Sequence, residues 1–434
     1  MIEILNIIFI YIIIIIFLTF PLSNRITSNK ITLSNKNIFE ILLRNSILFS
    51  YSLLIFSIFN ISQKHIFLIY LFLSLTNIII FFSKKKVKIN FIDVFLIFFI
   101  IISFSIVINI SYTPTLMWDG LAHWLLKVKV FFYNEEIEKI HNLPFNYYPH
   151  LGSYIWAFFW KNSFLNYEYT GRIYLVILYV ISIFSLINLF NNHINKYFKL
   201  FLLFTIIYLT KDISLFGGYQ EYFLFIYLLL ASKQCLTILS NNSKYNNSSF
   251  VLFLASSYIL TWFKQEGLVY FVLVNLILLI YIKDDFILKI KHLLLIILLL
   301  ILNFYLKKFF SGEFEMNELR RDFFINFNLK EFLYLNIFIM KHYIVSIFKY
   351  PIHFLIFLIF IFQFKKRNVI FNFYLTYFII SLLLIFSVFQ SYPGPVYQDI
   401  PLIIDRLILQ MSGFYLPYMI FVLNNKISNK NITL

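Results

Sequence analysis

Long apolar runs alternate with short polar segments along this chain. The clearest runs cover residues 4–20, 91–110, 292–306 and 371–389. Each run approaches or reaches the roughly 20 residues that an α-helix needs to cross a bilayer. A soluble core does not account for so many runs of this length. The pattern therefore predicts an all-α fold, a polytopic bundle of transmembrane helices.

Basic loops between the runs indicate the orientation of the chain. Residues 84–88 and 365–367 carry dense positive charge, and the positive-inside rule places both in the cytoplasm. Counting outward from these loops gives about thirteen spans. The N-terminus is then outside, the C-terminus is inside, and the polar loop at 111–150 faces outward.

Three apolar segments are too short for their role to follow from length. Residues 151–160 are predicted to form a re-entrant or interfacial helix. Residues 250–263 and 267–282 are either two tilted spans or one long helix that breaks at Gly267.

No internal repeat and no soluble domain is visible in the sequence, so we predict a single membrane domain. Its parts are N-terminal transmembrane helices at 1–110, an external loop with amphipathic juxtamembrane helices at 111–165, and the remaining transmembrane helices at 166–434. The first apolar run lacks a basic leading region and a cleavage site, which predicts a retained helix rather than a signal peptide.

Composition supports the same interpretation. Hydrophobic residues make up 61% of the chain and charged residues 13%, against about 25% charged in an ordinary soluble domain. The formal charge of +16 would suit nucleic acid, but the basic residues lie in short loops, where they set topology. We therefore expect a lipid bilayer and no nucleic acid as partner. The single Cys235 excludes an intramolecular disulfide and a cysteine-based metal site.

The external loop opens with three polar residues at helical spacing. Asp119, His123 and Lys127 fall at i, i+4 and i+8 and share one face of a helix. The apolar residues fall largely on the other face: Trp118, Leu121, Ala122, Leu125 and Val128. This pattern predicts an amphipathic helix on the membrane surface, with its polar groups pointing away from lipid. A carboxylate at this boundary suits an enzyme that acts on a lipid-linked substrate.

Each of these three residues also has a structural explanation. Asp119 is either a helix N-cap or a general base. His123 is either an interfacial anchor or a partner of Asp119. Lys127, like Lys129 beside it, either extends toward lipid headgroups or binds substrate.

Further polar residues are predicted on the outer side: Tyr148, His150, Glu221, Lys264, Glu266 and Arg406. A charge at membrane depth is costly, so it is usually paired, lines a cavity or carries function. Lys264 and Glu266 are expected to pair with each other or across helices, and a purely structural salt bridge explains them as well as a site does. Glu221 can complement the dipole at a helix start. Arg406 either anchors a helix at the interface or binds a phosphate through its planar fork.

These segments resemble bacterial members of the GT-C superfamily, integral membrane glycosyltransferases that use polyprenyl-phosphate-linked sugars. The matching segments, in order over roughly residues 110–420, are W-D-G-L-A-H-W-L-L-K-V-K, N-Y-Y-P-H-L-G-S-Y-I-W, G-G-Y-Q-E-Y, W-F-K-Q-E-G-L and D-R-L-I-L-Q. The superfamily often has Ala where this chain has Gly120, and Asp where it has Gln220 and Glu221. About four spans precede the external loop, whereas many members have one.

The resemblance implies a sugar transfer in which a base deprotonates the acceptor hydroxyl as it attacks the anomeric carbon. Asp119 would be that base, with Glu221 as the next candidate. Cationic groups would stabilise the leaving polyprenyl phosphate. The residues expected to bind substrate are His123, Lys127, Tyr148, His150, Lys264, Glu266 and Arg406.

The resemblance also bears on cofactors, partners and location. No nucleotide-binding loop is present in the sequence, and a polyprenyl phosphate leaving group needs none. Some members bind a divalent cation with loop acids, but the sequence identifies no ligands for a metal. The expected location is the bacterial inner membrane, with the active site on the periplasmic face. The acceptor would be a glycan, lipid or protein of the cell envelope.

Two other functions fit parts of the sequence. An O-antigen ligase or polymerase also uses polyprenyl-linked glycans, but it resembles a pattern with its large external loop late in the chain. The loop at 311–341, with Arg320 and Arg321, keeps this alternative open. A lipid or solute transporter would show two related halves and charges near the membrane midplane. The acidic residues here cluster at one predicted surface instead.

Overall fold

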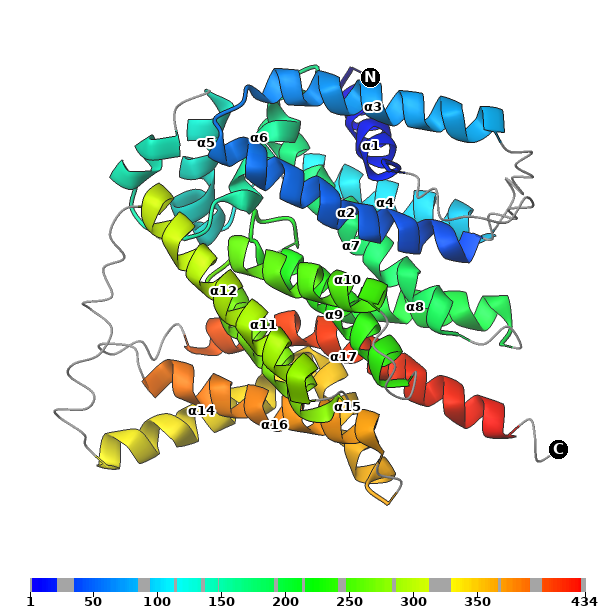
Figure 1. Ribbon diagram of the computed structural model, residues 1–434, viewed down its shortest axis with the longest axis vertical. Helices are drawn as coiled ribbons and strands as arrows, with labels where there is room; N and C mark the ends of the chain where they lie inside the picture. The colour runs from blue at the N-terminus through cyan, green and yellow to red at the C-terminus, as the bar shows by residue number, and fades with distance from the viewer. Residues whose placement is uncertain are drawn as a thin grey trace. The chain divides into compact units, whose positions relative to one another are not determined.

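The computed structural model describes residues 2–21, 35–84, 94–112, 115–133, 137–146, 148–190, 194–212, 215–240, 247–282, 286–311, 329–365, 368–390 and 400–430. Every regular element within these ranges is helical (Figure 1). Several predicted features lie outside the described residues: the basic residues 85–88 and 366–367, Tyr147, Arg320, Arg321, and the loop at 391–399.

The chain divides into two compact units. Unit 1 contains Met1–Ile226, Thr261–Gln265 and Ser428–Leu434, and unit 2 contains Tyr227–Leu260 and Glu266–Ile427. The helices α9 (Glu221–Ser240), η6 (Ile259–Trp262) and α17 (Ile400–Lys430) each cross this division along the chain.

Unit 1 is built around α7. Its helices are α1 (Ile2–Leu18), α2 (Asn35–Ile58), α3 (Gln63–Lys84), α4 (Val94–Tyr112), η1 (Gly120–Leu125), α5 (Leu126–Phe132), η2 (Ile137–Asn142), α6 (Leu151–Lys161), η3 (Glu168–Arg172), α7 (Ile173–Phe184), η4 (Ser185–Leu189) and α8 (Lys196–Thr210). All residues of α7 are buried, because a helix that is apolar on every side needs protein or lipid around it. It packs against α1, α2, α4 and α8 (Figure 1).

The short apolar segment predicted at 151–160 is α6. Residues 151–159 are all buried, and the helix packs against α2, α5 and η3. It is therefore enclosed by protein within unit 1, which explains how an apolar helix of 11 residues is accommodated.

Unit 2 shows how residues 250–282 are arranged. Its helices are most of α9, α10 (Asn247–Tyr258), α11 (Glu266–Tyr281), α12 (Phe286–Ser311), α14 (Leu329–Lys349), α15 (Pro351–Gln363), α16 (Val369–Gln390) and most of α17. Of the two predicted alternatives the structure has two helices, because α10 and α11 are separate and pack against each other. Gly267 lets the start of α11 approach η6, since a Cβ there would lie 2.0 Å from the carbonyl oxygen of Leu260.

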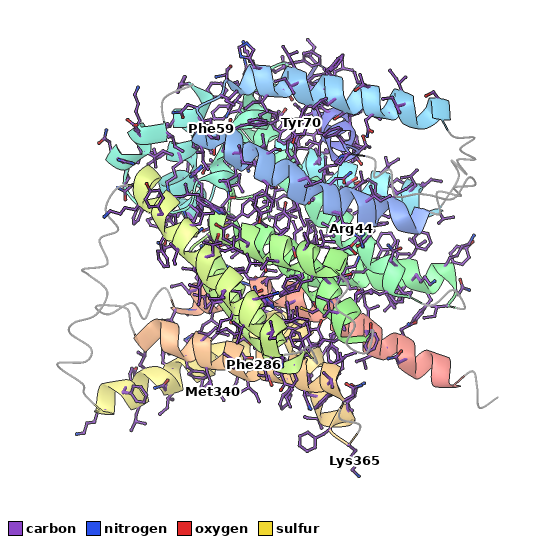
Figure 2. The ribbon with its side chains drawn as sticks, viewed as in Figure 1. Arg44, Phe59, Tyr70, Phe286, Met340 and Lys365 are labelled. Atoms are coloured by element: carbon purple, nitrogen blue, oxygen red, sulfur yellow. The ribbon has the colours of Figure 1, made fainter. Side chains whose placement is uncertain are left out.

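Nine helices within the described residues are long and apolar enough to cross a membrane: Ile38–Ile58, Gln63–Ile80, Val94–Tyr112, Glu168–Leu189, Glu221–Ser240, Phe286–Lys308, Phe332–Lys349, Val369–Phe386 and Ile400–Asn425. Four shorter apolar helices accompany them: Ile2–Leu18, Ser248–Trp262, Glu266–Tyr281 and Pro351–Gln363. Large apolar side chains such as Phe286 and Met340 are exposed (Figure 2), as expected where lipid is the solvent. The prediction of a polytopic helical membrane protein is confirmed at this level. The count of about thirteen spans stays a prediction.

Candidate functional site

The polar face of the predicted surface helix points into unit 1. Asp119, His123 and Lys127 are only 9%, 7% and 0% exposed, whereas Trp118 on the other side is 65% exposed. The three groups are thus buried within unit 1 rather than exposed on the surface of the helix, and their expected orientation away from lipid stays a prediction. The physical reason for their burial is that the interior of unit 1 supplies partners for the polar groups, while an indole can face lipid or its headgroups.

A π-helical turn, η1, begins directly after Asp119. The turn brings Oδ1 of Asp119 to 3.9 Å from Nε2 of His123. The backbone of Asp119 is itself helical (φ −61°, ψ −37°), and its side chain makes no capping hydrogen bond to η1. These observations argue against the N-cap explanation for Asp119. π-Helical turns are rare and often occur at functional sites.

Aromatic rings surround His123. The ring centroids of Phe145, Trp118 and Tyr148 lie 3.9, 5.0 and 5.3 Å from the centroid of the imidazole. The exposed Trp118 forms one side of this enclosure. The Asp119–His123 pair therefore lies beneath a partly exposed aromatic rim.

Two lysines hold this region together. Lys127 donates to the carbonyl oxygens of Tyr148 at 2.6 Å and Asn146 at 3.4 Å. Its ammonium also lies 5.8 Å from the centre of the Tyr148 ring, within cation–π range. Lys161 donates to the carbonyl oxygen of Phe132 at 2.7 Å, and burial, together with the nearby charge of Lys64, lowers the pKa of Lys161.

His150 is paired with a serine. The hydroxyl of Ser57 donates to the carbonyl oxygen of Leu54 at 2.7 Å, so its oxygen accepts from Nε2 of His150 at 3.0 Å. This arrangement fixes the tautomer of a neutral His150 with its proton on Nε2. Because the Ser57 proton is held by the backbone, the pair is not an activated nucleophile.

The loop before η1 docks onto a turn formed by residues 216–220. The amide of Met117 donates to the carbonyl oxygen of Gly217 at 3.1 Å. A Cβ at Gly120 would lie 2.3 Å from that same oxygen. The glycine is therefore required by the close approach of two backbones.

Glu221 and Lys264 form a buried ion pair. Nζ of Lys264 lies 2.8 Å from Oε1 of Glu221, and the two side chains are 3% and 0% exposed. Glu221 is the first residue of α9, where a carboxylate complements the helix dipole. The ring of Phe263 stacks on that of Phe223 at 4.2 Å beside this pair. The pairing expected for Lys264 is thus across helices.

The other two predicted site residues belong to unit 2. Glu266 begins α11 and Arg406 lies on α17. Next to Arg406, the carboxylate of Asp405 accepts from Lys349 and Ser346, each at 2.5 Å. Within the described residues, no group of three or more His, Cys, Asp or Glu side chains has the arrangement of a metal site.

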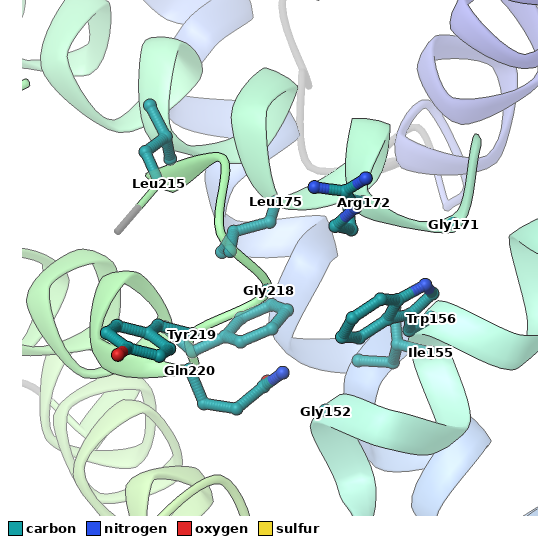
Figure 3. A pocket seen from close by; sticks show the side chains of 11 residues that line it. Gly152, Ile155, Trp156, Gly171, Arg172, Leu175, Leu215, Gly218, Tyr219 and Gln220 are labelled. Carbon is teal, nitrogen blue, oxygen red and sulfur yellow. The ribbon is translucent and has the colours of Figure 1, made fainter. Parts of the chain in front are cut away.

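A small pocket adjoins the 216–220 turn on the side of α6 and η3 (Figure 3). Its lining includes the side chains of Trp156, Arg172 and Gln220. The amide of Gln220 lies on Gly152, where a Cβ would stand 1.8 Å from Oε1. The remaining space is about that of one water molecule and is too small for a sugar.

Arg172 is a residue of this region that the sequence prediction missed. It pairs with Glu168, four residues earlier, at 2.9 Å. The signal was present in the sequence, because Glu168 and Arg172 are spaced i, i+4 at the start of an apolar run. A buried Arg at that position calls for an explanation.

Comparison of the chain with protein-family models, with curated proteins and with solved structures finds no match in any of the three.

Proposed function

We propose that this protein is a membrane glycosyltransferase of GT-C type that transfers a sugar from a polyprenyl-phosphate donor to a cell-envelope glycan, lipid or protein. The site would lie on the periplasmic face of a bacterial inner membrane. The proposal starts from the order of the motif segments in the sequence. Its structural support comes from which of these segments meet in unit 1.

The observation that carries the proposal is the convergence of four motif segments that are distant in sequence. Asp119 follows Met117, which bonds to Gly217 of the glycine turn. Gly152, in the second segment, packs on Gln220, and Glu221 pairs with Lys264 of the fourth segment. A structural bundle does not require these particular segments to meet, whereas an active site does.

In this proposal Asp119 is the general base. Its carboxylate takes the proton of the acceptor hydroxyl while the acceptor oxygen bonds to the anomeric carbon. The bond from that carbon to the phosphate oxygen breaks, and its electron pair leaves with the polyprenyl phosphate. His123 beside Asp119 orients the carboxylate or the acceptor. Glu221 is the weaker candidate for the base, because Lys264 already occupies one of its oxygens.

The remaining predicted residues would bind substrate. Tyr148 is part of the aromatic rim over His123. Lys127 and His150 support the floor of the site, Lys127 through its bond to the carbonyl oxygen of Tyr148 and His150 through its bond to Ser57. Glu266 and Arg406 stay proposed substrate-binding residues, with Arg406 suited to phosphate by its planar fork. A phosphate at Lys264 would compete with Glu221 for the ammonium.

The decisive experiment compares Asp119→Asn with Glu138→Gln. Glu138 is an exposed carboxylate in the same loop, so the second variant controls for the loss of one negative charge. Purified protein is mixed with radiolabelled polyprenyl-phosphate sugars and with membranes of a deletion strain that supply the acceptor. We expect Asp119→Asn to lower the transfer rate about 10²–10⁴-fold and Glu138→Gln to leave it nearly unchanged.

Two outcomes would count against the proposal. Near-normal transfer by a well-folded Asp119→Asn protein would move the base elsewhere, with Glu221→Gln tested next. Absence of transfer by the wild-type protein from every polyprenyl-phosphate sugar in the panel would contradict the donor class itself.

A further inference from the structure

We propose that Arg172 is a positioning residue that holds the 216–220 turn against the loop carrying Asp119. The inference rests on the proposed function, because it concerns how that site keeps its geometry. Arg172 was not among the residues that the sequence singled out. It lies at the junction of η3 and α7, where it is 3% exposed.

The guanidinium of Arg172 is used in two directions. Nη2 donates to Oε2 of Glu168 at 2.9 Å, and Nη1 donates to the carbonyl oxygen of Phe216. The planar fork can serve both acceptors at once, whereas a lysine ammonium is a single point on a flexible stem. One arm is thus fixed on η3 while the other holds the first residue of the turn.

Trp156 is the surface on which the turn sits. Its indole donates to the carbonyl oxygen of Glu168 at 3.2 Å, and its ring lies 5.9 Å from the Arg172 guanidinium. Gly218 adopts a φ of +83°, and a Cβ there would lie 2.7 Å from the indole. Figure 3 shows Gly218 of the turn with Trp156 and Arg172 around the pocket. The turn is therefore held from one side by Arg172 and supported by Trp156.

The other side of the turn contacts the candidate active site. Gly217, which follows the residue held by Arg172, accepts from the amide of Met117 and lies against Gly120. Asp119 is between these two contacts in sequence. A shift of the turn therefore moves the backbone on both sides of Asp119, and a displacement of about 1 Å in a catalytic group can lower a rate roughly 100-fold.

The geometry favours positioning over direct binding of substrate. Nη1 and Nη2 of Arg172 both donate to acceptors within the protein. The adjacent pocket has room for about one water molecule. A sugar or a phosphate would have to displace the turn in order to reach the guanidinium.

The first test is kinetic and uses Arg172→Lys and Arg172→Met. We expect both variants to lower kcat about 100-fold. KM for the polyprenyl-phosphate sugar should change less than about threefold, which corresponds to roughly 0.6 kcal/mol. Lys should not rescue activity, because it keeps the charge but not the two-armed fork. Arg44→Met is the matched control, since Arg44 forms the same i, i+4 pair with Glu40 but its side chain is 51% exposed. Rescue by Lys, or a loss confined to KM, would overturn the proposal.

The second test needs no activity. Met117 and Gly217 are replaced by Cys in a Cys235→Ser chain, because a Cβ at Gly217 would lie 3.1 Å from the Cβ of Met117, near the separation of about 3.5–4.5 Å in a disulfide. With Arg172 present we expect rapid closure of the disulfide by mild oxidant. With Arg172→Met closure should slow several-fold, because the turn is no longer held. Equal rates of disulfide closure in the two folded proteins would contradict the positioning role of Arg172.

The two tests separate the inference from the proposed function. If wild-type protein transfers no sugar but the rates of disulfide closure differ, the positioning role of Arg172 stands and the proposed function fails. If wild-type protein transfers sugar and Arg172→Met transfers it at the same rate, the proposed function stands and the positioning role of Arg172 fails. Should Arg172→Met fail to fold, Arg172→Gln replaces it, because Gln keeps a hydrogen-bonding group at this buried position but is too short to serve Glu168 and Phe216 together. The expected result for Gln is slower disulfide closure than in the wild type, and an equal rate would overturn the proposal.

Discussion

Glu221 and Lys264 illustrate how a charge is accommodated at the residue scale. Both side chains are almost completely buried, and the removal of one partner leaves the other charge without compensation. Such a loss typically costs about 3–5 kcal/mol. The pair is therefore expected to contribute to the free energy of unfolding, independently of any role in binding substrate.

We predict that Lys264→Met lowers the free energy of unfolding by about 3–5 kcal/mol. The double variant Lys264→Met with Glu221→Gln should be more stable than Lys264→Met alone, because no uncompensated carboxylate is left. Reversible unfolding in detergent, followed by circular dichroism, measures both effects.

The matched control for this cycle is Lys349→Met. The Lys349 side chain is 53% exposed although it lies 2.5 Å from Asp405, so its loss should cost less than about 1 kcal/mol. If Lys264→Met lowers the free energy of unfolding no more than Lys349→Met does, while it abolishes transfer from the polyprenyl-phosphate sugar, Lys264 acts on the substrate rather than as a structural partner.

At the scale of the element, a glycine decides how closely α11 approaches η6, the turn that follows α10. Gly267 stands in the first turn of α11, and a Cβ there would meet the backbone of Leu260 at 2.0 Å from oxygen and 2.4 Å from carbon. Backbone atoms cannot move aside as a flexible side chain can, so α11 and η6 would have to separate.

We therefore predict that Gly267→Ala destabilises the protein by about 1–3 kcal/mol, the usual cost of overpacking. Thermal unfolding of the purified protein measures the effect. The control is Val269→Ala on the same helix, where the side chain is 44% exposed and its truncation should be nearly neutral. An unchanged unfolding temperature for Gly267→Ala would mean that α11 and η6 do not pack this closely.

At the scale of the whole molecule, the apolar helices require a bilayer and the basic loops predict its orientation. The exposed Glu138 lies in the predicted external loop, and the exposed Lys365 lies at a predicted cytoplasmic end. The native Cys235 is buried, so unmodified protein serves as the unlabelled control.

We predict that Glu138→Cys reacts with a membrane-impermeant maleimide in intact cells, whereas Lys365→Cys reacts only after permeabilisation. The physical reason is the asymmetry of Lys and Arg between the two sets of loops. Gel shifts of the labelled protein report the result. The opposite labelling pattern would place the Asp119 loop in the cytoplasm and remove the periplasmic site from the proposed function.

The sequence by itself determined that the chain is helical and suited to a membrane. Apolar runs such as residues 91–110 predict this because the transfer of a helix into lipid depends mainly on its own residues, summed along a continuous segment. The sequence also indicated that Lys264 needs a partner, because an unpaired charge at that depth is costly. These inferences are local and do not require knowledge of which segments meet.

Only the tertiary structure decided which groups are partners. Glu221 lies far from Lys264 in sequence, and nothing in the spacing of residues distinguished it from the nearer Glu266. The helical spacing of Asp119 and His123 predicted a shared polar face but not the side to which it turns. A polar face is stable in water and equally stable in an interior that supplies hydrogen bonds and charges. That interior exists only once distant segments have packed, which is why the spacing of Glu168 and Arg172 indicated their ion pair but not the bond from Arg172 to Phe216.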